Sequence, residues 1–453
     1  MASPGCPGSY WLEVYGCQMN VSDSEVIGGI LARAGYIEAE SPSSADVVLV
    51  LTCAVREHAE VRALGRIAQL AGMRSGKGSR PLIVLCGCVA QEHGESILGT
   101  LHGVDLVVGP DGYRSLPGLL AGEGGACSVT LGSEDYEGIR AVRRGFPRAF
   151  VSIMRGCDNY CSYCIVPFVR GAERSREADA VVEEVAELSS AGYGEITLLG
   201  QNVNSYSSVG GVDFTQLLRM AAEAAGPAWI RFLTSHPRDF SPGIPETMAK
   251  CPNICAQVHL PVQSGSDRML SLMNRSYTRE DFLGKVAALR ERVPDVVLST
   301  DMIAGFPGET EEDFSLSLSL LEEVRFDYAF LFRYSERTGT AAASLPGALP
   351  VAERLLRLHE LQETQNGITR EKSRALEGRA LPVLVTGRGG RPDQQSARTA
   401  GNRVAILSGT SFEPGAFLLV RVVSADGWTH MCEPVRAARP GEALPASESA
   451  VPT

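Results

Sequence analysis

The sequence predicts an α/β protein with an N-terminal parallel α/β sheet domain, a central partial (βα)6 barrel and a small C-terminal β-domain. Three observations predict this fold class. Short apolar runs alternate with helical stretches over residues 9–120, a second alternation begins at residue 149, and glycine-punctuated strands end the chain. A length of 453 residues suits about three domains. Hydrophobic residues make up 44% of the chain and charged residues 21%, which is an ordinary globular composition.

The N-terminal domain is predicted over residues 9–120. Ser22 and Glu25 form a capping box that begins a helix over 22–34, and a second helical stretch follows at 56–71. Continuous Val, Ile and Leu runs are typical of strands covered on both faces, and they predict strands at 11–17, 47–53, 81–88 and 104–110. Residues 121–148 are richer in glycine and charge and are predicted to be a linker.

The central domain is predicted over residues 149–376. Its helices are clearest at 177–191 and 311–324, and its strands are expected at 149–154, 195–199, 228–234, 256–262, 297–305 and 327–334. Six βα units are too few for a closed (βα)8 barrel, so the sequence predicts a partial, open barrel that ends in a charged helix over 351–376. The β-domain is expected over 377–438, and the Pro/Ala/Glu/Ser-rich residues 439–453 are expected to form a disordered tail.

The overall charge limits the function classes. The formal net charge is −11, which excludes a wholly basic nucleic-acid binder but allows a local basic patch. No run approaches the ~18 apolar residues of a membrane span, so we expect no membrane partner. The first residues lack a basic segment followed by an apolar core, so no secretory signal is visible. Twelve cysteines therefore indicate reduced thiols, and with them a cytoplasmic location.

Three cysteines share one position relative to the predicted strands. Cys17, Cys53 and Cys88 each follow an apolar run directly and precede a turn into a helix. Because the carboxyl ends of parallel strands lie at one edge of a sheet, we expect the three thiols to converge there. The alternative is three buried, inert cysteines, which are common in proteins. Cys86 lies inside its strand and is expected to be a packing residue.

A second triad lies in the segment RGCDNYCSYC, after the first predicted strand of the barrel. Its cysteines are Cys157, Cys161 and Cys164, with three and then two residues between them. Three closely spaced thiolates can hold three irons of a [4Fe–4S] cluster and leave the fourth iron open for a ligand, which is typical of a catalytic cluster. Zinc is the competing interpretation, but zinc prefers a fourth nearby ligand, and the next histidine, His236, is far along the chain.

This cysteine spacing, with the aromatic Tyr163 before the last cysteine, resembles the radical S-adenosylmethionine (SAM) superfamily. Over residues 9–438 the chain is similar to the radical SAM methylthiotransferases of the MiaB type. The similarity rests on YGCQMNVSDSE (15–25), LTCAVREHAE (51–60), GCVAQ (87–91), MRGCDNYCSYCIVPFVRGAERSR (154–176), LLGQNVNSY (198–206), FLTSHP (232–237), HLPVQSGSD (259–267), MNRSYTRE (273–280) and DMIAGFPGETEEDF (301–314).

The resemblance implies a two-cluster enzyme that methylthiolates C2 of N6-isopentenyladenosine at position 37 in the anticodon loop of tRNA. Cys157, Cys161 and Cys164 would hold the cluster that binds and reductively cleaves SAM. Cys17, Cys53 and Cys88 would hold an auxiliary [4Fe–4S] cluster that carries the sulfur to be inserted. The implied partners are a tRNA anticodon stem-loop and an external electron donor, and we expect a monomer. The resemblance also identifies the C-terminal β-domain as a TRAM-like β-barrel that binds tRNA.

Other predicted strand ends carry polar residues where the sites of such barrels are built. The candidates are Gln201, Asn202, Ser235, His236, Gln263 and Ser264. Gly305 and Gly308 would let the backbone approach the adenosyl group of SAM closely. The alternative is that these residues only form caps and turns, and that His236 is a structural histidine.

Two stretches are locally basic and predict contact with RNA phosphates. Residues 140–176 hold eight arginines against two acidic residues, and residues 379–439 hold eight against four. In the second stretch we expect Arg398, Arg403 and Arg421 to contact phosphates. The sequence departs from the family here, because the usual Gly-Arg-Thr reads Ala397-Arg398-Thr399.

Two rival functions remain on sequence alone. One is a sibling methylthiotransferase that acts on threonylcarbamoyladenosine in tRNA or on an aspartate of a ribosomal protein. Gln18, Met19 and Asn20 after the first cysteine argue against it, because those relatives usually carry other residues there. The other rival is a catalytically silent iron–sulfur protein that binds RNA. The intact second triad argues against it, since a pure binding module needs no open iron.

Overall fold

The computed structural model describes residues 7–55, 57–73, 80–132, 134–409 and 411–438, so the tail predicted at 439–453 lies outside the described residues. The chain divides into two units. The first unit comprises Met1–Arg144, Met154–Tyr160 and Cys164–Arg176, and the second comprises Gly145–Ile153, Cys161–Tyr163 and Glu177–Thr453.

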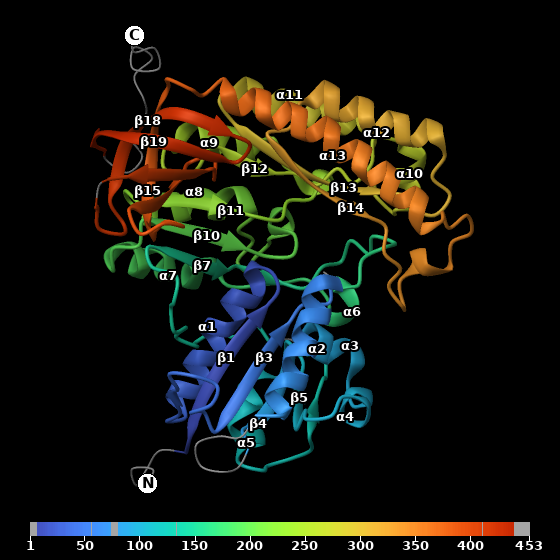
Figure 1. Ribbon diagram of the computed structural model, residues 1–453, viewed down its shortest axis with the longest axis vertical. Helices are drawn as coiled ribbons and strands as arrows, with labels where there is room; N and C mark the ends of the chain where they lie inside the picture. Colours follow the sequence, from blue (N-terminus) through green and yellow to red (C-terminus); the bar gives the residue numbers. More distant parts are fainter. Residues whose placement is uncertain (1–6, 56, 74–79, 133, 410, 439–453) are drawn as a thin grey trace. The chain divides into compact units, whose positions relative to one another are not determined.

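The first unit is built on a parallel sheet with the strand order β2-β1-β3-β4-β5-β6, of which Figure 1 labels β1, β3, β4 and β5. Its strands are β1 (Ser9–Tyr15), β2 (Ile37–Glu38), β3 (Val47–Thr52), β4 (Leu82–Gly87), β5 (Leu106–Val108) and β6 (Cys127–Ser128). Its helices are α1 (Gln18–Arg33), α2 (Glu57–Ala71), α3 (Cys88–His93), α4 (Ser96–Thr100), α5 (Leu116–Leu120) and α6 (Val166–Arg170). The stretch 121–148, expected as a linker, contributes β6, because Val107 pairs with Cys127.

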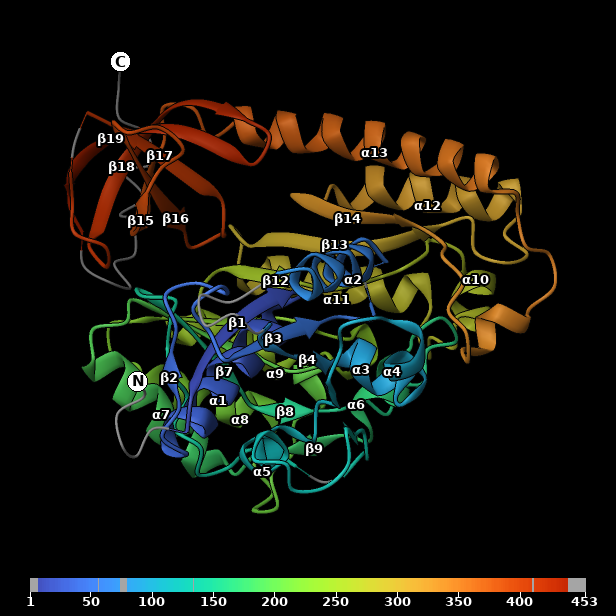
Figure 2. The ribbon, with the colours of Figure 1, turned by 60° about the horizontal axis from the view of Figure 1, so that its bottom comes forward.

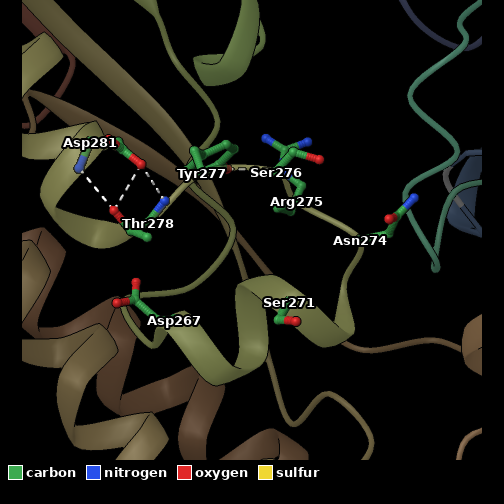
Figure 3. Close-up of a pocket in the computed structure, with 8 residues that line it drawn as sticks. All are labelled: Asp267, Ser271, Asn274, Arg275, Ser276, Tyr277, Thr278 and Asp281. Carbon is green, nitrogen blue, oxygen red and sulfur yellow. Dashed lines mark hydrogen bonds between the residues drawn. The ribbon is translucent and has the colours of Figure 1, made fainter.

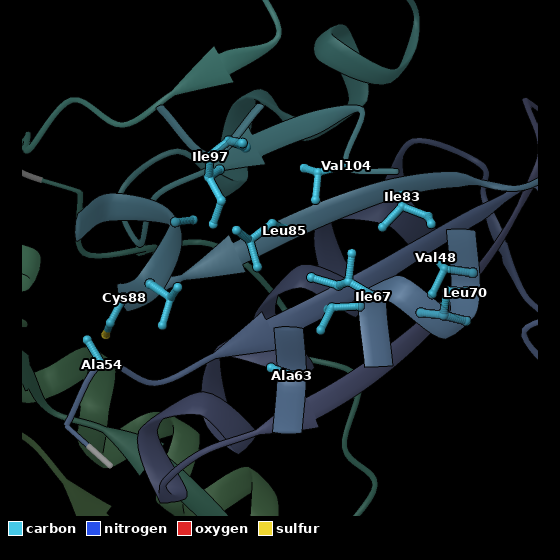
Figure 4. Packing of buried hydrophobic residues seen from close by; sticks show 14 of the residues in the cluster. Val48, Ala54, Ala63, Ile67, Leu70, Ile83, Leu85, Cys88, Ile97 and Val104 are labelled. Carbon is cyan, nitrogen blue, oxygen red and sulfur yellow. The ribbon is translucent and has the colours of Figure 1, made fainter. Parts of the chain in front are cut away.

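Both faces of this sheet are covered. Alternate residues of β3 and β4 enter two different cores, since successive side chains of a strand point to opposite faces. One core holds Val48, Ile83 and Leu85 with Ala63, Ile67 and Leu70 of α2 (Figure 4), and Val50 belongs to it as well. The other holds Leu49, Leu51, Val84 and Cys86 with Ile27, Ile30 and Leu31 of α1. This arrangement explains why the strands are continuously apolar.

The second unit contains the partial barrel. In its described residues, parallel strands form two sheets, β11-β10-β7 and β12-β13-β14, and Ile230 of β11 forms an isolated bridge to Ile254, which precedes β12. The strands are β7 (Arg148–Ser152), β10 (Glu195–Leu199), β11 (Trp229–Phe232), β12 (Gln257–His259), β13 (Val297–Ala304) and β14 (Tyr328–Arg333). Helices α7 (Ala178–Ser190), α8 (Phe214–Ala224), α9 (Gly243–Lys250), α10 (Asp267–Leu272), α11 (Arg279–Arg292) and α12 (Glu311–Val324) connect them. The predicted fold class is confirmed.

A long helix leads from the partial barrel to the end of the chain. Helix α13 (Val351–Arg374) packs on β13, β14 and α12, and a closed barrel with the strand order β15-β16-β17-β19-β18 follows it (Figure 2). The barrel strands are β15 (Ala380–Arg388), β16 (Gln394–Thr399), β17 (Val404–Ser408), β18 (Phe417–Asp426) and β19 (Thr429–Ala437). Among the described residues, no helix is both long and apolar enough to cross a membrane.

Candidate functional site

The carboxyl ends of three neighbouring strands of the first unit bring Cys17, Cys53 and Cys88 together. Cys17 caps α1 after β1, Cys53 follows β3, and Cys88 begins α3 directly after β4. The Cys17 thiol donates to Oδ1 of Asn20 at 3.3 Å, and the closeness of Cys53 lowers the pKa of Cys17 while Cys17 raises that of Cys53. Burial raises the pKa of Cys88, and Cys17 lies close enough to add to that shift. The thiols converge as their positions after the strands predict.

Small residues and an asparagine make this convergence possible. A Cβ on Gly16 would lie 2.8 Å from the Cβ of Cys53, and a Cβ on Gly87 would lie 2.5 Å from the Thr52 carbonyl oxygen. Gly87 also has a φ of 94°, which favours glycine. The buried side chain of Asn20 donates to the Thr52 carbonyl at 2.7 Å, so it ties the first turn of α1 to the end of β3. The backbone is therefore shaped to place the cysteines side by side.

A buried group of charges adjoins Cys88. Arg170 of α6 donates from Nε to the Cys88 Sγ at 3.2 Å, and its Nη1 lies 2.8 Å from Oδ2 of Asp23. Arg155 donates to the other oxygen of Asp23 at 2.6 Å and lies over the ring of Tyr136. Burial opposes these charges, but Arg155 and Arg170 still lower the pKa of Asp23, and Asp23 raises that of Arg170. These ionised groups stabilise one another.

The chemistry of Cys17, Cys53 and Cys88 fits a four-iron cluster. Within the described residues, no three His, Cys, Asp or Glu side chains are grouped so that they could hold one metal ion. A [4Fe–4S] cluster takes each thiolate on a different iron, and three soft sulfur donors suit it. Cys86, two residues before Cys88, belongs to the core on the other face of the sheet and is a packing residue.

Each cysteine of the second triad is described within its own unit. Cys157 and Cys164 belong to the first unit, and Cys161 belongs to the second. In the first unit, β8 (Met154–Arg155) pairs with β9 (Arg174–Ser175), and the Cys157 N–H donates to the Gly171 carbonyl at 3.2 Å. A Cβ on Gly156 would lie 1.9 Å from the Ala172 carbonyl oxygen, so only glycine fits before Cys157.

In the second unit, Cys161 lies beside another buried arginine. Arg275 donates from Nη1 to the Cys161 Sγ at 3.4 Å and from Nη2 to the Pro261 carbonyl at 2.6 Å. Ser162 donates to the Leu272 carbonyl at 2.8 Å, and the Tyr163 ring lies 6.5 Å from that of Phe306. Arg275 also lines a pocket, shown in Figure 3, together with Asp267, Ser271, Asn274, Ser276, Tyr277, Thr278 and Asp281.

Buried polar atoms lie after the ends of β10 and β11. In the described structure, Gln201 Oε1, Asn202 Oδ1, Ser235 Oγ and His236 Nε2 are buried and have no hydrogen-bond partner. Burial, with Arg275 and Arg238 nearby, lowers the pKa of His236 to about 2, so its ring is neutral. Its Nδ1 accepts from the Arg238 N–H, so the proton lies on Nε2. These buried, unpaired groups fit a polar ligand, because unpaired buried polar atoms are rare in folded proteins.

The other predicted ligand contacts have structural explanations. The Ser264 hydroxyl contacts that of Ser317 at 3.2 Å and accepts from the Ser266 N–H. Gln263 has a φ of 72° and its backbone bonds to β13. A Cβ on Gly305 would lie 2.6 Å from Arg354 of α13, and the Gly308 N–H donates to the Gly347 carbonyl. The backbone at Gly305 therefore approaches α13 closely.

The basic stretch 140–176 is largely neutralised inside the first unit. Its arginines pair with acidic residues of that unit, in the pairs Arg143–Glu25, Arg144–Glu38, Arg155–Asp23, Arg170–Asp23 and Arg174–Asp111. Five arginines that the sequence assigns to RNA contact thus bind carboxylates of their own unit. The local excess of arginines is explained by acidic partners elsewhere in the sequence.

The three arginines predicted in the C-terminal barrel differ in exposure. Arg403 is buried, pairs with Asp327 at 2.9 Å and lies over the Trp428 ring, so it fastens the barrel to the start of β14 instead of facing phosphate. Arg398 is half-buried and donates to the Asn402 carbonyl at 2.9 Å. Arg421 is exposed on β18.

Known proteins resemble the chain over nearly its full length. A family model described as "Radical SAM superfamily" matches residues 151–321, and one described as "Uncharacterized protein family UPF0004" matches residues 9–109. A tRNA-2-methylthio-N(6)-dimethylallyladenosine synthase of Bacteroides thetaiotaomicron is 46% identical over 432 residues, which cover 92% of this chain and 94% of the relative. A protein of the same name from Chlorobium phaeobacteroides is 45% identical, with the same coverage of both chains.

Solved structures share the fold at low identity. The radical S-adenosylmethionine methyltransferase TsrM from Kitasatospora setae, solved with cobalamin and a [4Fe-4S] cluster bound, superposes with a TM-score of 0.55 at 13% identity and covers 74% of each chain. This likeness concerns the fold alone. Because the curated relatives match nearly the whole chain at close to half identity, the chain belongs to the tRNA-2-methylthio-N(6)-dimethylallyladenosine synthase family within the radical SAM superfamily.

Proposed function

We propose that this protein is the enzyme that attaches a methylthio group to C2 of N6-isopentenyladenosine at position 37 of tRNA, with SAM and two [4Fe–4S] clusters as cofactors. The observation that carries the proposal is the presence of two separate cysteine triads in a chain that matches the named synthases over 92% of its length. Each triad leaves one iron of a cluster without a protein ligand, which a four-cysteine electron-transfer site does not do.

The two cysteine triads would hold different clusters. Cys157, Cys161 and Cys164 would hold the cluster that binds SAM, and Cys17, Cys53 and Cys88 would hold the auxiliary cluster. When bound, these groups supply the reductive cleavage of SAM and the sulfur for insertion, chemistry that amino-acid side chains cannot perform on an unactivated aromatic C–H bond.

The polar side chains of the partial barrel would bind and orient SAM. Gln201, Asn202 and Ser235 offer buried oxygens that lack partners, and His236 offers a single Nε2–H donor on a neutral ring. A neutral donor can hold an adenine nitrogen or a ribose oxygen without adding charge to the site. Such fixed groups position a reacting atom without rearrangement during the reaction.

The partners follow from the reaction. The substrate is a tRNA anticodon stem-loop, in which an unpaired base can turn out into a protein site. Reductive cleavage of SAM consumes an electron, so an external electron donor is required. We further propose that the enzyme acts as a monomer in the cytoplasm, where reduced thiols and tRNA occur together, and that the C-terminal barrel is a TRAM-like contact for tRNA.

The test measures metal content and product together. After anaerobic reconstitution, we expect about eight irons per chain, and about four in the triple alanine variant of either triad. C17A should still release 5′-deoxyadenosine from SAM but form no methylthio product. C86A is the matched control, because Cys86 is a buried cysteine on the other face of the sheet.

The substrate is tested in the same assay. Mass spectrometry of nucleosides should detect product from isopentenylated tRNA and none from threonylcarbamoylated tRNA or from ribosomal protein. Product from one of the other two substrates would instead favour a sibling methylthiotransferase. A C17A variant that forms product at the wild-type rate would show that this triad is not the sulfur site.

A further inference from the structure

Arg170 contacts a cysteine thiol and a buried carboxylate at once. Its guanidinium joins Sγ of Cys88, at 3.2 Å from Nε, to Oδ2 of Asp23, at 2.8 Å from Nη1. Both side chains of the ion pair are 3% exposed or less, so water does not compete for these contacts. No step of the proposed reaction has yet used this group.

We propose that Arg170 is a positioning residue that, held by Asp23, donates a charged hydrogen bond to the Cys88 thiolate and thereby raises the reduction potential of the auxiliary cluster. The inference rests on the proposed function, in which Cys17, Cys53 and Cys88 hold that cluster. It concerns the potential of the cluster and not its presence.

The surrounding residues fix the direction of this hydrogen bond. Arg170 ends the short helix α6, whose Val169 is buried in the same core as Val89 of α3. Arg155 donates to the other carboxylate oxygen of Asp23, Oδ1, at 2.6 Å. With Asp23 held between the two arginines, the guanidinium of Arg170 has its Nε directed at the sulfur.

The sign of the effect follows from charge. Reduction adds one negative charge to a cluster whose ligands are already thiolates. A cationic donor on a ligand sulfur stabilises this reduced form more than the oxidised form, and hydrogen bonds to the sulfurs are known to set cluster potentials. Asp23 balances one of the two arginines, so Arg155 and Arg170 together leave one positive charge in excess beside Cys88.

Arg155 and Arg170 flank the second cysteine triad in the sequence. Arg155 lies two residues before Cys157, and Arg170 lies six residues after Cys164. The segment that carries the second triad therefore also supplies the charge beside the first. Electronic adjustment of the auxiliary cluster is built into the same stretch of chain that would bind the SAM cluster.

The experiment isolates the auxiliary cluster. In the C157A/C161A/C164A background, only the Cys17, Cys53 and Cys88 site remains, and its midpoint potential is measured by anaerobic titration with electron paramagnetic resonance detection. We expect R170Q to lower the reduction equilibrium constant at least about tenfold, which is about 59 mV for one electron. R170K, which keeps the charge but not the forked donor, should fall between R170Q and the parent.

Two further variants separate electrostatics from folding. R174M is the matched control, because the described contacts of the nearby cation Arg174 go to Asp111 and to backbone carbonyls; its potential should equal that of the parent. D23N removes the balancing negative charge and should shift the potential upward, opposite to R170Q. A purely structural role predicts no such opposite shifts.

The outcomes distinguish the two proposals. If the background variant holds no iron, the proposed auxiliary site fails. If it holds about four irons but R170Q and R170K titrate with the parent, the inference about Arg170 is overturned. Should R170Q fail to assemble a cluster, the comparison of R170K with the parent decides: a lower potential supports the proposal, and an unchanged one overturns it.

Discussion

At the scale of single residues, the sequence identifies the cysteines but not the groups around them. Cys17, Cys53 and Cys88 are predictable because each follows an apolar strand, and the structure brings their thiols together. Asp23 and Arg155 are not predictable as partners, because they are 132 residues apart and no sequence pattern in either segment indicates the other residue. The same limit applies to the contact between Arg275 and Cys161.

Gly87 gives the sharpest prediction at this scale. A Cβ at this position would lie 2.5 Å from the Thr52 carbonyl oxygen, and a φ of 94° is strained for alanine. G87A should therefore displace Cys88 and leave only about four irons per chain after reconstitution. The control is G99A in α4, where a Cβ meets no atom within 4 Å, and it should keep about eight irons. Equal iron content in the two variants would contradict this account of Gly87.

At the scale of elements, long strands are predictable and short ones are not. The strand at 195–199 is predicted to the residue, and β13 at Val297–Ala304 matches a prediction of 297–305, because both are sustained apolar runs. By contrast, β2, β6, β8 and β9 are two residues long, and only their partners define them. Helix α13 is predicted as a charged helix. The sequence does not predict the partners of those charges, such as Asp327 for Lys372 and Glu309 for Arg357.

Asp327, just before β14, joins α13 and the C-terminal barrel to the partial barrel. Its carboxylate accepts from Lys372 of α13 at 2.8 Å, from Arg403 at 2.9 Å and from the Leu298 N–H at 3.0 Å. D327N would leave two cations without their counter-ion, and breaking a buried pair in this way costs about 3–5 kcal/mol.

Chemical denaturation should detect this loss in the free energy of unfolding. The control is E371Q, which removes an exposed ion pair with Arg325 and should change stability by no more than about 1 kcal/mol. A D327N variant as stable as E371Q would show that this carboxylate does not fasten the two elements.

At the scale of the whole molecule, charge counted along the sequence is a poor guide to an RNA surface. The chain carries a net charge of −11, and its densest arginine segment, 140–176, is largely paired with carboxylates of its own unit. In the C-terminal barrel, Arg403 is buried for the same reason. Pairing depends on the fold, so exposure must be known before an arginine is assigned to a phosphate.

Exposure leads to a revised prediction for tRNA binding. Arg388, Arg391 and Arg421 are exposed on the C-terminal barrel, and their simplest use is phosphate contact, which positions the substrate and carries little sequence information. The variant R388E/R391E/R421E should bind tRNA more weakly, and the slope of log affinity against log salt should become shallower by about one for each lost contact. Release of 5′-deoxyadenosine without RNA should be unchanged, because the barrel that would bind SAM is untouched.

The matched control R219E/R292E/R370E makes the same change in net charge at exposed arginines outside the C-terminal barrel. Equal affinities and slopes in the two variants would mean that net charge alone governs binding and that the C-terminal barrel does not hold the tRNA.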